Sequence, residues 1–327
     1  MTDSRTTTHH GPGLSIVIPA YNEADSIPEL MFEIQQSMEA QDFPWEVIFI
    51  DDGSSDGTLV AMRDAARGNK RVTVIPFTRN QGKSAAYTTA FEIAKYPLVA
   101  TMDADLQDDP HELSAMIQLL HSGWDLVVGY KQGRMGNEAK KAIPSRLFNK
   151  WTSLVFGLKL HDYNSGLRVM RREVCTDLDL YSGRYRFIPA LARLQGFRVT
   201  EQPVHHRKRK FGKSKFGPSR FLTGLLDIFS IRIISLFNQR PFHLFGSIGL
   251  ILFLVGTGLA GLTLYRKIWN HDLFSNHFAA IISAATCAIL AVHFAAIGII
   301  GELLLVVSRR QSRRSIQENH NLTDTEA

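Results

Sequence analysis

The residues best suited to chemistry are two aspartates near the middle of the chain, Asp103 and Asp105, followed by Gln107. Two carboxylates that are two positions apart at the end of a strand can converge on a hard divalent cation. Mg²⁺ is bound in proteins by one or two carboxylates together with phosphate oxygens of a substrate. A solvated acidic turn has the same composition. The apolar run 98–102 directly before the pair favours a metal site over such a turn.

Two further polar clusters are suited to binding a nucleotide. In the first, PAYNE at 19–23, Tyr21 can stack on a base and Glu23 can accept hydrogen bonds from hydroxyls or amines. In the second, DDGSSDGT at 51–58, Asp51 and Asp52 are suited to binding a base or ribose. The later residues Ser55 or Asp56 could instead cap a helix.

The segment RNQGKS at 79–84 contains a Gly-Lys-Ser string that is also found in phosphate-binding loops. The full pattern requires a glycine five residues before Gly82. That position is Phe77, so we exclude a P-loop NTPase.

These clusters follow short apolar runs that are typical of strands. The runs are LSIVI (14–18), VIFI (47–50), VTVIPF (72–77), LVATM (98–102) and LVVGY (126–130). Helix-like stretches such as 26–40 and 111–123 lie between them, and this alternation predicts βαβ units with a parallel sheet. Ligands of such sheets bind outside the carboxyl ends of the strands, where the polar clusters fall. Residues 131–166 look less regular and are rich in Lys, Arg and Gly.

The last third of the chain is typical of a membrane protein. Between His243 and Val307 only four residues are charged, and the stretches 242–265 and 278–307 are each long enough to cross a bilayer. Arginines before the first stretch and after the second place both ends in the cytosol, although Arg266 and Lys267 oppose this orientation. A buried hairpin of a soluble domain is the alternative. The two cysteines, Cys175 and Cys287, exclude a disulfide scaffold.

The net charge of +6 comes from the segment between the two halves of the chain, since His205 to Arg220 contains seven Lys/Arg and no acid. Residues 217–240 have apolar positions at helical spacing, which predicts an amphipathic helix at a membrane surface or an ordinary packed helix. Some of Arg207, Lys208, Arg209, Lys210 and Lys213 are suited to binding anionic lipid headgroups. We do not expect nucleic-acid binding, because the segment adjoins a membrane span.

Taken together, PAYNE, DDGSSDGT, RNQGK and DADLQ resemble, in order and spacing, the family 2 glycosyltransferases of the GT-A fold. The segments HDYNSGLRVMRR (161–172) and RKFGKSKF (209–216) and the membrane hairpin resemble the polyprenyl-phosphate glycosyltransferases within that family. The Gln-x-x-Arg-Trp string of processive synthases is absent from the sequence.

The resemblance implies a UDP- or GDP-sugar donor, a dolichyl or undecaprenyl phosphate acceptor, and Mg²⁺ or Mn²⁺. It implies that the nucleotide contacts Pro19, Tyr21, Glu23, Asp51, Asp52, Lys83 and Asp103. The metal ligands would be Asp103, Asp105 and Gln107, and the catalytic residues Asp105, Arg209 and Lys215. The acceptor phosphate would be bound by Lys131, Arg146, Asp162, Ser165 and Arg168. Lys131 stands where the group usually has arginine, and lysine lacks the bidentate fork of arginine.

The expected organisation is a disordered tail (1–13), a GT-A catalytic domain (14–216), an amphipathic juxtamembrane helix (217–240), a transmembrane hairpin (241–308) and a cytosolic tail (309–327). The fold class is α/β, with a Rossmann-like, mostly parallel sheet. The expected function is metal-dependent, inverting sugar transfer to polyprenyl phosphate at the cytosolic face of a bacterial inner membrane, by a chain that could form homo-oligomers. The alternative is a non-catalytic, membrane-anchored protein that binds or transports lipid phosphate or nucleotide-sugar.

Overall fold

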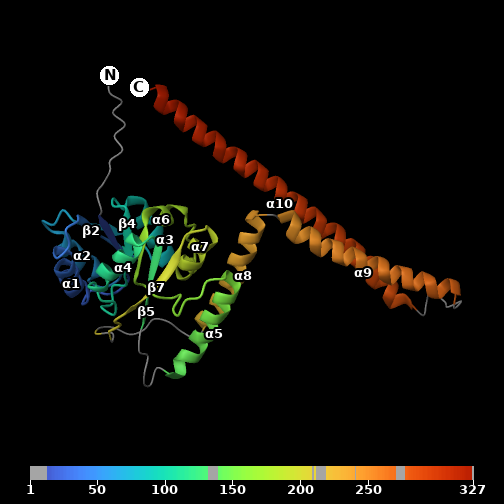
Figure 1. Ribbon diagram of the computed structural model, residues 1–327, viewed down its shortest axis with the longest axis horizontal. Helices are drawn as coiled ribbons and strands as arrows, with labels where there is room; N and C mark the ends of the chain where they lie inside the picture. Colours follow the sequence, from blue (N-terminus) through green and yellow to red (C-terminus); the bar gives the residue numbers. More distant parts are fainter. Residues whose placement is uncertain are drawn as a thin grey trace. The chain divides into compact units, whose positions relative to one another are not determined.

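The structure is a computed structural model that describes residues 13–131, 139–207, 210, 219–239, 241–269 and 277–325. The chain divides into two compact units, Met1–Ile228 and Phe229–Ala327. The first unit holds the predicted sheet, and the second holds two long apolar helices (Figure 1).

The sheet and its helices alternate along the first unit. The strands are β1 (Leu14–Ala20), β2 (Trp45–Asp51), β3 (Val72–Pro76), β4 (Leu98–Thr101), β5 (Leu126–Lys131), β6 (Arg168–Arg171) and β7 (Val199–Val204). The helices are α1 (Ile27–Glu39), α2 (Thr58–Ala66), α3 (Lys83–Ile93), α4 (Glu112–His121), α5 (Ala139–Phe156), α6 (Arg172–Asp177), the short 3₁₀ helix η1 (Arg184–Phe187) and α7 (Ile188–Leu194). The helix α8 (Ser219–Gln239) begins in the first unit and ends in the second.

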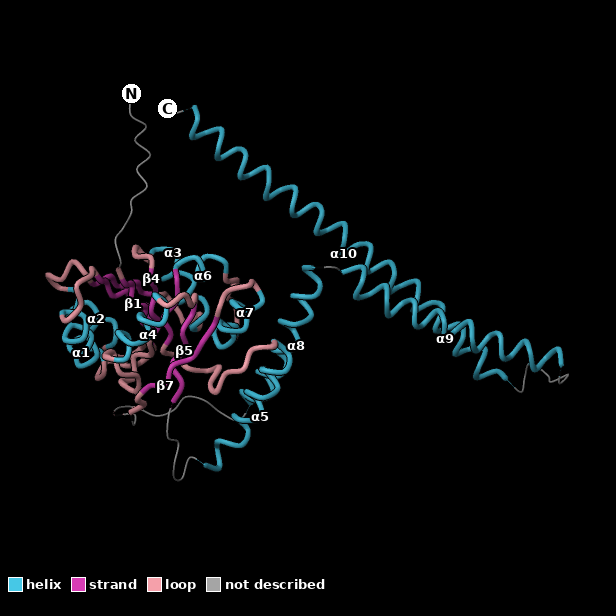
Figure 2. The backbone as a smooth tube through the Cα atoms, viewed as in Figure 1, coloured by secondary structure: helices cyan, strands magenta, loops and turns pink. Residues whose placement is uncertain are grey.

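The described strands, which Figure 2 draws in magenta, form one sheet. Their order is β3-β2-β1-β4-β6-β5-β7. β1 pairs in parallel with β2 and β4, β2 with β3, and β5 with β7. Only β6, which lies between β4 and β5, runs antiparallel to its neighbours among these strands. The predicted α/β fold with a mostly parallel sheet is confirmed.

Burial of apolar side chains on both faces explains why residues 14–20 form a strand of the sheet. Leu14, Ile16 and Ile18 of β1 are fully buried on one face, where they join the core formed with α1, α2 and α4. All seven residues of β1 are buried, so both of its faces are covered, and its sequence is apolar apart from Ser15.

The expectation that residues 131–166 are irregular is wrong for their central part. Residues Ala139–Phe156 form the helix α5. The apolar residues of this helix are interrupted by lysines and an arginine, and this hid its period. Phe148 and Phe156 are nevertheless buried, and their rings pack against Phe187 at centroid distances of 6.0 and 6.4 Å.

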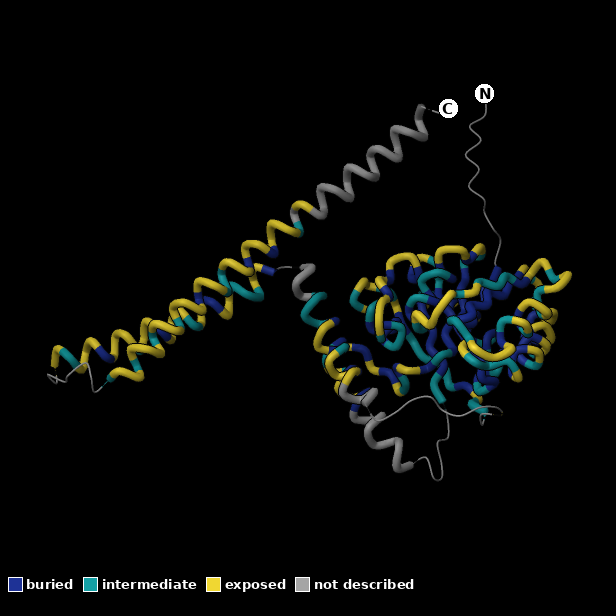
Figure 3. Tube along the Cα trace, turned by 180° about the vertical axis from the view of Figure 1, so that it is seen from behind, coloured by how far each residue is buried: buried dark blue, intermediate teal, exposed yellow. Residues whose placement is uncertain are grey.

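The second unit is a hairpin of α9 (Pro241–Trp269) and α10 (Phe278–Thr325). Two stretches, Pro241–Trp269 and Phe278–Leu305, are long and apolar enough to cross a membrane, and only 17% of the most apolar window in each is buried. Figure 3 shows exposed residues along most of both helices, in contrast to the buried strands of the first unit. So little burial argues against the buried core hairpin of a soluble domain.

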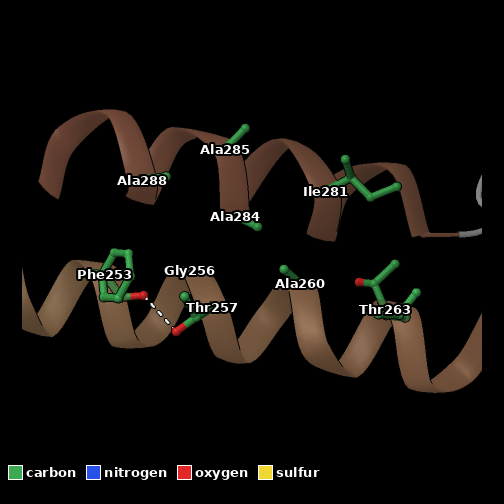
Figure 4. A pocket seen from close by; sticks show the side chains of 10 residues that line it. Phe253, Gly256, Thr257, Ala260, Thr263, Ile281, Ala284, Ala285 and Ala288 are labelled. Carbon is green, nitrogen blue, oxygen red and sulfur yellow. Dashed lines mark hydrogen bonds between the residues drawn. The ribbon is translucent and has the colours of Figure 1, made fainter. Parts of the chain in front are cut away.

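Small residues bring the two apolar helices close together. A Cβ at Gly249 would lie 2.9 Å from the carbonyl oxygen of Ala291, and one at Gly256 would lie 3.1 Å from that of Ala284. Next to this contact lies a groove of about 480 Å³, whose lining includes Ala260 and other small or apolar side chains (Figure 4). Close backbone approach at Gly and Ala is typical of helix packing in membranes.

Candidate active site

The carboxyl ends of the first strands meet at one edge of the sheet, as predicted. Ala20, the last residue of β1, pairs in register with Asp51, and Asp51 pairs with Pro76. A cleft of about 670 Å³ opens here. It is lined by Pro19, Ala20, Tyr21, Glu23, Asp52, Asn80, Gly82, Lys83, Asp103, Ala104, Asp105, Ser182, Gly183, Tyr185, Arg186, Thr223, Leu226 and Asp227.

The turns after β1 and β2 are tied to each other by hydrogen bonds. Asn22 has the left-handed backbone conformation (φ 53°), and its side-chain oxygen accepts the N–H of Ser55 at 2.8 Å. The N–H of Asn22 donates to the hydroxyl of Ser54 at 3.0 Å. This cross-linking places Tyr21 and Glu23 in the cleft lining.

The two aspartates at the end of β2 have different surroundings. Asp51 is buried (2% exposed), accepts the N–H of Ser54 at 3.1 Å and does not line the cleft. Asp52 lines the cleft and accepts the backbone N–H groups of Gln81, at 2.6 Å, and Gly82, at 3.0 Å. Burial raises the pKa of Asp52, and these two hydrogen bonds oppose that shift. Asp52 therefore also holds the loop before α3 in place.

Asp103 lines the cleft and forms an ion pair with Lys83. The Nζ–Oδ1 distance is 2.7 Å, and the two side chains are 30% and 28% exposed. Burial raises the pKa of Asp103, but Lys83, Lys131 and Arg168 outweigh it, and the net pKa is lowered. Burial lowers the pKa of Lys83, but the charge of Asp103 and smaller contributions together outweigh burial, and the net pKa is raised above its usual value. Both groups are therefore charged at neutral pH.

The backbone around Asp103 leaves room for its carboxylate. A Cβ at Gly166 would lie 2.6 to 2.9 Å from the three carboxylate atoms of Asp103, so only glycine fits without a shift. The carbonyl of Gly166 accepts the hydroxyl of Thr101, the last residue of β4, at 2.8 Å. The segment 161–172, which resembles a family motif, therefore packs directly against Asp103 through Gly166.

In the loop after β4, Asp105 lines the cleft, whereas Gln107 does not. Asp105 lines the cleft and accepts the N–H of Gln107 at 3.2 Å. The Gln107 side chain lies outside the lining, where its amide is 3.2 Å from Nε2 of His206 and donates to the carbonyl of Arg207 at 3.4 Å. Leu106 between them is buried and has a positive φ of 60°, a conformation that non-glycine residues rarely adopt outside functional sites.

Four of the residues expected to bind the acceptor phosphate have described side chains, and these do not line the cleft: Lys131, Asp162, Ser165 and Arg168. Ser165 and Arg168 are 1% exposed. Nε and Nη1 of Arg168 lack hydrogen-bond partners among the described residues, and burial lowers the pKa of this guanidinium. Asp162 caps its own turn by accepting the N–H of Asn164 at 2.9 Å. Lys131 is outside the lining but within electrostatic reach of Asp103.

The other sequence-predicted cations differ in what the structure describes of them. Arg209 and Lys215 lie outside the described residues, and Arg146 lies on α5 with its side chain outside them. Arg207 pairs with Glu33 at 2.6 Å and with Asp109 at 2.7 Å. Lys210 pairs with Glu29 at 2.6 Å. Part of the basic run is therefore bound to acids of α1 and of the loop after Asp105.

One wall of the cleft was missed from the sequence. It is formed by Ser182, Gly183, Tyr185 and Arg186 around η1 and by Thr223, Leu226 and Asp227 of α8. None of these residues follows a strand of the parallel sheet. The one sequence feature that could have indicated this wall is Asp227, a lone acid among the apolar residues of the predicted amphipathic helix 217–240.

Comparison with known proteins agrees with this architecture. The model of the family described as "Glycosyl transferase family 2" matches residues 15–179. The dodecaprenyl-phosphate galacturonate synthase of Rhizobium johnstonii is 35% identical over 241 residues, covering 72% of this chain and 71% of that protein. The undecaprenyl-phosphate 4-deoxy-4-formamido-L-arabinose transferase of Pseudomonas syringae pv. syringae is 31% identical over 292 residues, covering 89% of this chain and 85% of that protein.

Among solved structures, glucosyl-3-phosphoglycerate synthase from Mycobacterium tuberculosis in complex with Mg²⁺ and UDP has a similar fold. The TM-score is 0.52 at 19% identity, with 67% of this chain and 79% of that chain covered. The matched family region contains β1 to β6 and the acidic cleft residues up to Asp105. The chain belongs to glycosyl transferase family 2.

Proposed function

We propose that this chain transfers a sugar from a nucleotide-sugar to a polyprenyl phosphate at the cytosolic face of a bacterial inner membrane. The observation that carries the proposal is a cleft with paired carboxylates at the strand ends, in a chain that also has two membrane-length apolar helices. The names of the two relatives, a dodecaprenyl-phosphate and an undecaprenyl-phosphate sugar transferase, support this choice of acceptor.

The nucleoside is assigned to the end of the cleft beside β1 and β2. Tyr21 lines the cleft and is 36% exposed, and an aromatic ring in this position is suited to stack on a base. Glu23 and Asp52 line the same end and are suited to accept hydrogen bonds from hydroxyl or amino groups. Lys83 lies at the boundary with the acidic pair and is suited to contact the diphosphate.

The residues at the centre of the cleft fit a divalent cation. Asp103 already holds a cation, the ammonium of Lys83, at 2.7 Å, and Gly166 leaves space around its carboxylate. Asp103 and Asp105 both line the cleft, and Mg²⁺ is bound in proteins by one or two carboxylates together with substrate phosphate oxygens. Asp103 and Asp105 would hold Mg²⁺ or Mn²⁺, which supplies charge neutralisation to the leaving nucleoside diphosphate.

The acceptor explains why the cleft needs no general base. A phosphate monoester has a second pKa near 6, so it is mostly dianionic at pH 7 and can attack the anomeric carbon directly. Inversion at that carbon follows from a single displacement. Lys131 lies outside the lining, but its positive charge acts on Asp103 and is suited to attract this anion. The assignments of Arg146, Asp162, Ser165, Arg168, Arg209 and Lys215 to phosphate groups remain part of the proposal.

The test is an assay of the full chain, purified in detergent, with undecaprenyl phosphate, Mg²⁺ and a panel of UDP- and GDP-sugars. Asp103→Ala should abolish formation of the lipid-linked sugar. The control Asp64→Asn, in an exposed ion pair with Arg67, should retain it. Transfer that survives Asp103→Ala would contradict the site. Donor binding without transfer by the wild type would favour a binding or transport protein.

A further inference from the structure

The contacts along the cleft give its parts an order. Asp52, at the nucleoside end, holds Gly82, and the next residue, Lys83, pairs with Asp103. Nζ of Lys83 lies 6.0 Å from the centroid of the Tyr185 ring. The hydroxyl of Tyr185 in turn accepts Nε–H of Arg186 at 3.3 Å. The wall around η1 and α8 therefore adjoins the Lys83–Asp103 pair through Tyr185.

Asp227 places a carboxylate in this wall. A Cβ at Gly183 would lie 2.6 Å from Oδ2 of Asp227, so the missing side chain of Gly183 makes the room that the carboxylate occupies. Asp227 makes no hydrogen bond to any described residue, although it is partly buried and lines the cleft. Because this carboxylate faces the cleft, its oxygens are suited to accept hydrogen bonds from a ligand that displaces water there.

Arg186 is the cation that accompanies Asp227 in the lining. Burial raises the pKa of Asp227, and the charges of Arg186 and Arg184 only partly oppose this shift, so the net pKa is raised. Arg184 is occupied elsewhere, since it pairs with Asp179 at 3.4 Å and its guanidinium stacks on Tyr181 at 3.8 Å. Arg184 also does not line the cleft, whereas Arg186 and Asp227 both do and therefore present opposite charges to a ligand that binds there.

We propose that Asp227 and Arg186 bind the sugar of the nucleotide-sugar donor, with Asp227 accepting hydrogen bonds from its hydroxyl or amino groups. The inference rests on the proposed function. If the nucleoside lies at Tyr21 and the diphosphate at Asp103, the group beyond the diphosphate is the sugar. The anionic acceptor phosphate is disfavoured at Asp227, because the two negative charges repel each other.

The proposal is tested by measuring binding to the full chain in detergent with Mg²⁺. The probes are UDP, GDP, UDP-glucose, UDP-N-acetylglucosamine, UDP-galacturonic acid and GDP-mannose. The readout is the Kd of the tightest nucleotide-sugar divided by the Kd of its nucleoside diphosphate. Asp227→Asn should raise this ratio about tenfold or more, since a lost hydrogen bond to a charged group is worth at least that factor.

Two further variants separate a role in binding from a role in folding. Gly183→Ala keeps the charge of Asp227 but forces its carboxylate to move, and φ at Gly183 is −82°, which alanine adopts freely. It should raise the ratio in the same direction. The control Asp64→Asn, outside the cleft, should leave the ratio unchanged.

Each outcome decides the question. A raised ratio with an unchanged Kd for the nucleoside diphosphate supports the proposal. An unchanged ratio, or an effect confined to the KM of undecaprenyl phosphate, overturns it while the proposed transferase activity stands. A wild type that binds none of the probes overturns the proposed function and this inference with it.

Discussion

The ion pair between Lys83 and Asp103 leads to a testable prediction, because the ammonium of Lys83 binds the same carboxylate that we propose binds a metal. The substitution Lys83→Met removes the charge and keeps most of the aliphatic stem. The pair is 2.7 Å long, and its two side chains are 28% and 30% exposed, so it lies between an exposed and a buried ion pair. We expect a loss of about 1 to 3 kcal/mol in the free energy of unfolding.

The same substitution should change the response to metal. In the wild type a divalent cation competes with Lys83 for Asp103, whereas in the variant the carboxylate has lost that competitor. A ligand at a hundred times its Kd stabilises a protein by about 2.7 kcal/mol. Mg²⁺ or Mn²⁺ should therefore raise the melting temperature of Lys83→Met more than that of the wild type, while sugar transfer falls because the contact to the diphosphate is lost.

The assay is thermal unfolding of the full chain in detergent, with EDTA or with increasing Mg²⁺ or Mn²⁺. In EDTA, the expected loss in the free energy of unfolding of Lys83→Met corresponds to a melting temperature lower by roughly 3 to 10 °C for a domain of this size. Lys95→Met is the matched control, since Lys95 pairs with Glu46 at 3.1 Å away from the cleft lining. Equal metal-induced shifts in the wild type and both variants would refute the idea that Lys83 occupies the place of a cation.

Three other substitutions test separate parts of the structure. Gly166→Ala would place a Cβ within 2.9 Å of the Asp103 carboxylate, so the Mg²⁺ concentration for half-maximal activity should rise at least tenfold in a titration. Asp52→Ala releases the N–H groups of Gln81 and Gly82, so calorimetry should show nucleotide affinity about tenfold weaker; equal affinity would contradict this. Asp125, which is held by Arg198, has a lowered pKa although burial opposes the shift. Its stabilising effect is present above the ordinary value of 3.8 and is lost as pH falls through the lowered pKa. Melting curves should therefore show Asp125→Asn destabilised by about 1 to 3 kcal/mol at pH 7, with the difference from the wild type shrinking toward pH 3; a constant difference would contradict the assignment.

The parts of the fold that depend on local pattern could be predicted from the sequence. β1 to β5 coincide with the five apolar runs, and the clusters that follow the first four lie at one edge of the sheet. β6 and β7 were missed for identifiable reasons. β6 is four residues long and begins with the buried Arg168, and β7 contains Pro203 and lies at the sheet edge, where proline is tolerated.

The wall around η1 and α8 could not be predicted, because it depends on contacts between distant segments. Asp227 meets Gly183, which is 44 positions earlier, and no periodicity encodes that pairing. Ser165 shows what packing adds to a motif. The motif suggested that Ser165 binds the acceptor phosphate, and this role stays a prediction for a side chain that is 1% exposed and does not line the cleft. Residue type and spacing indicate which side chains are near the site, but only packing decides which of them reach it.

The division of α8 between the two units has a practical consequence for protein engineering. A shortened, more soluble version of the chain would most simply be cut before Ser219, where the amphipathic helix begins. That cut would remove Asp227 and the contact of Gly224 with Phe148, and with them one side of the cleft. A cut after Ile228 keeps the wall intact. It also leaves Leu225, which is 41% exposed and outside the cleft lining, as an apolar residue to be covered by a mild surfactant or replaced by a polar residue.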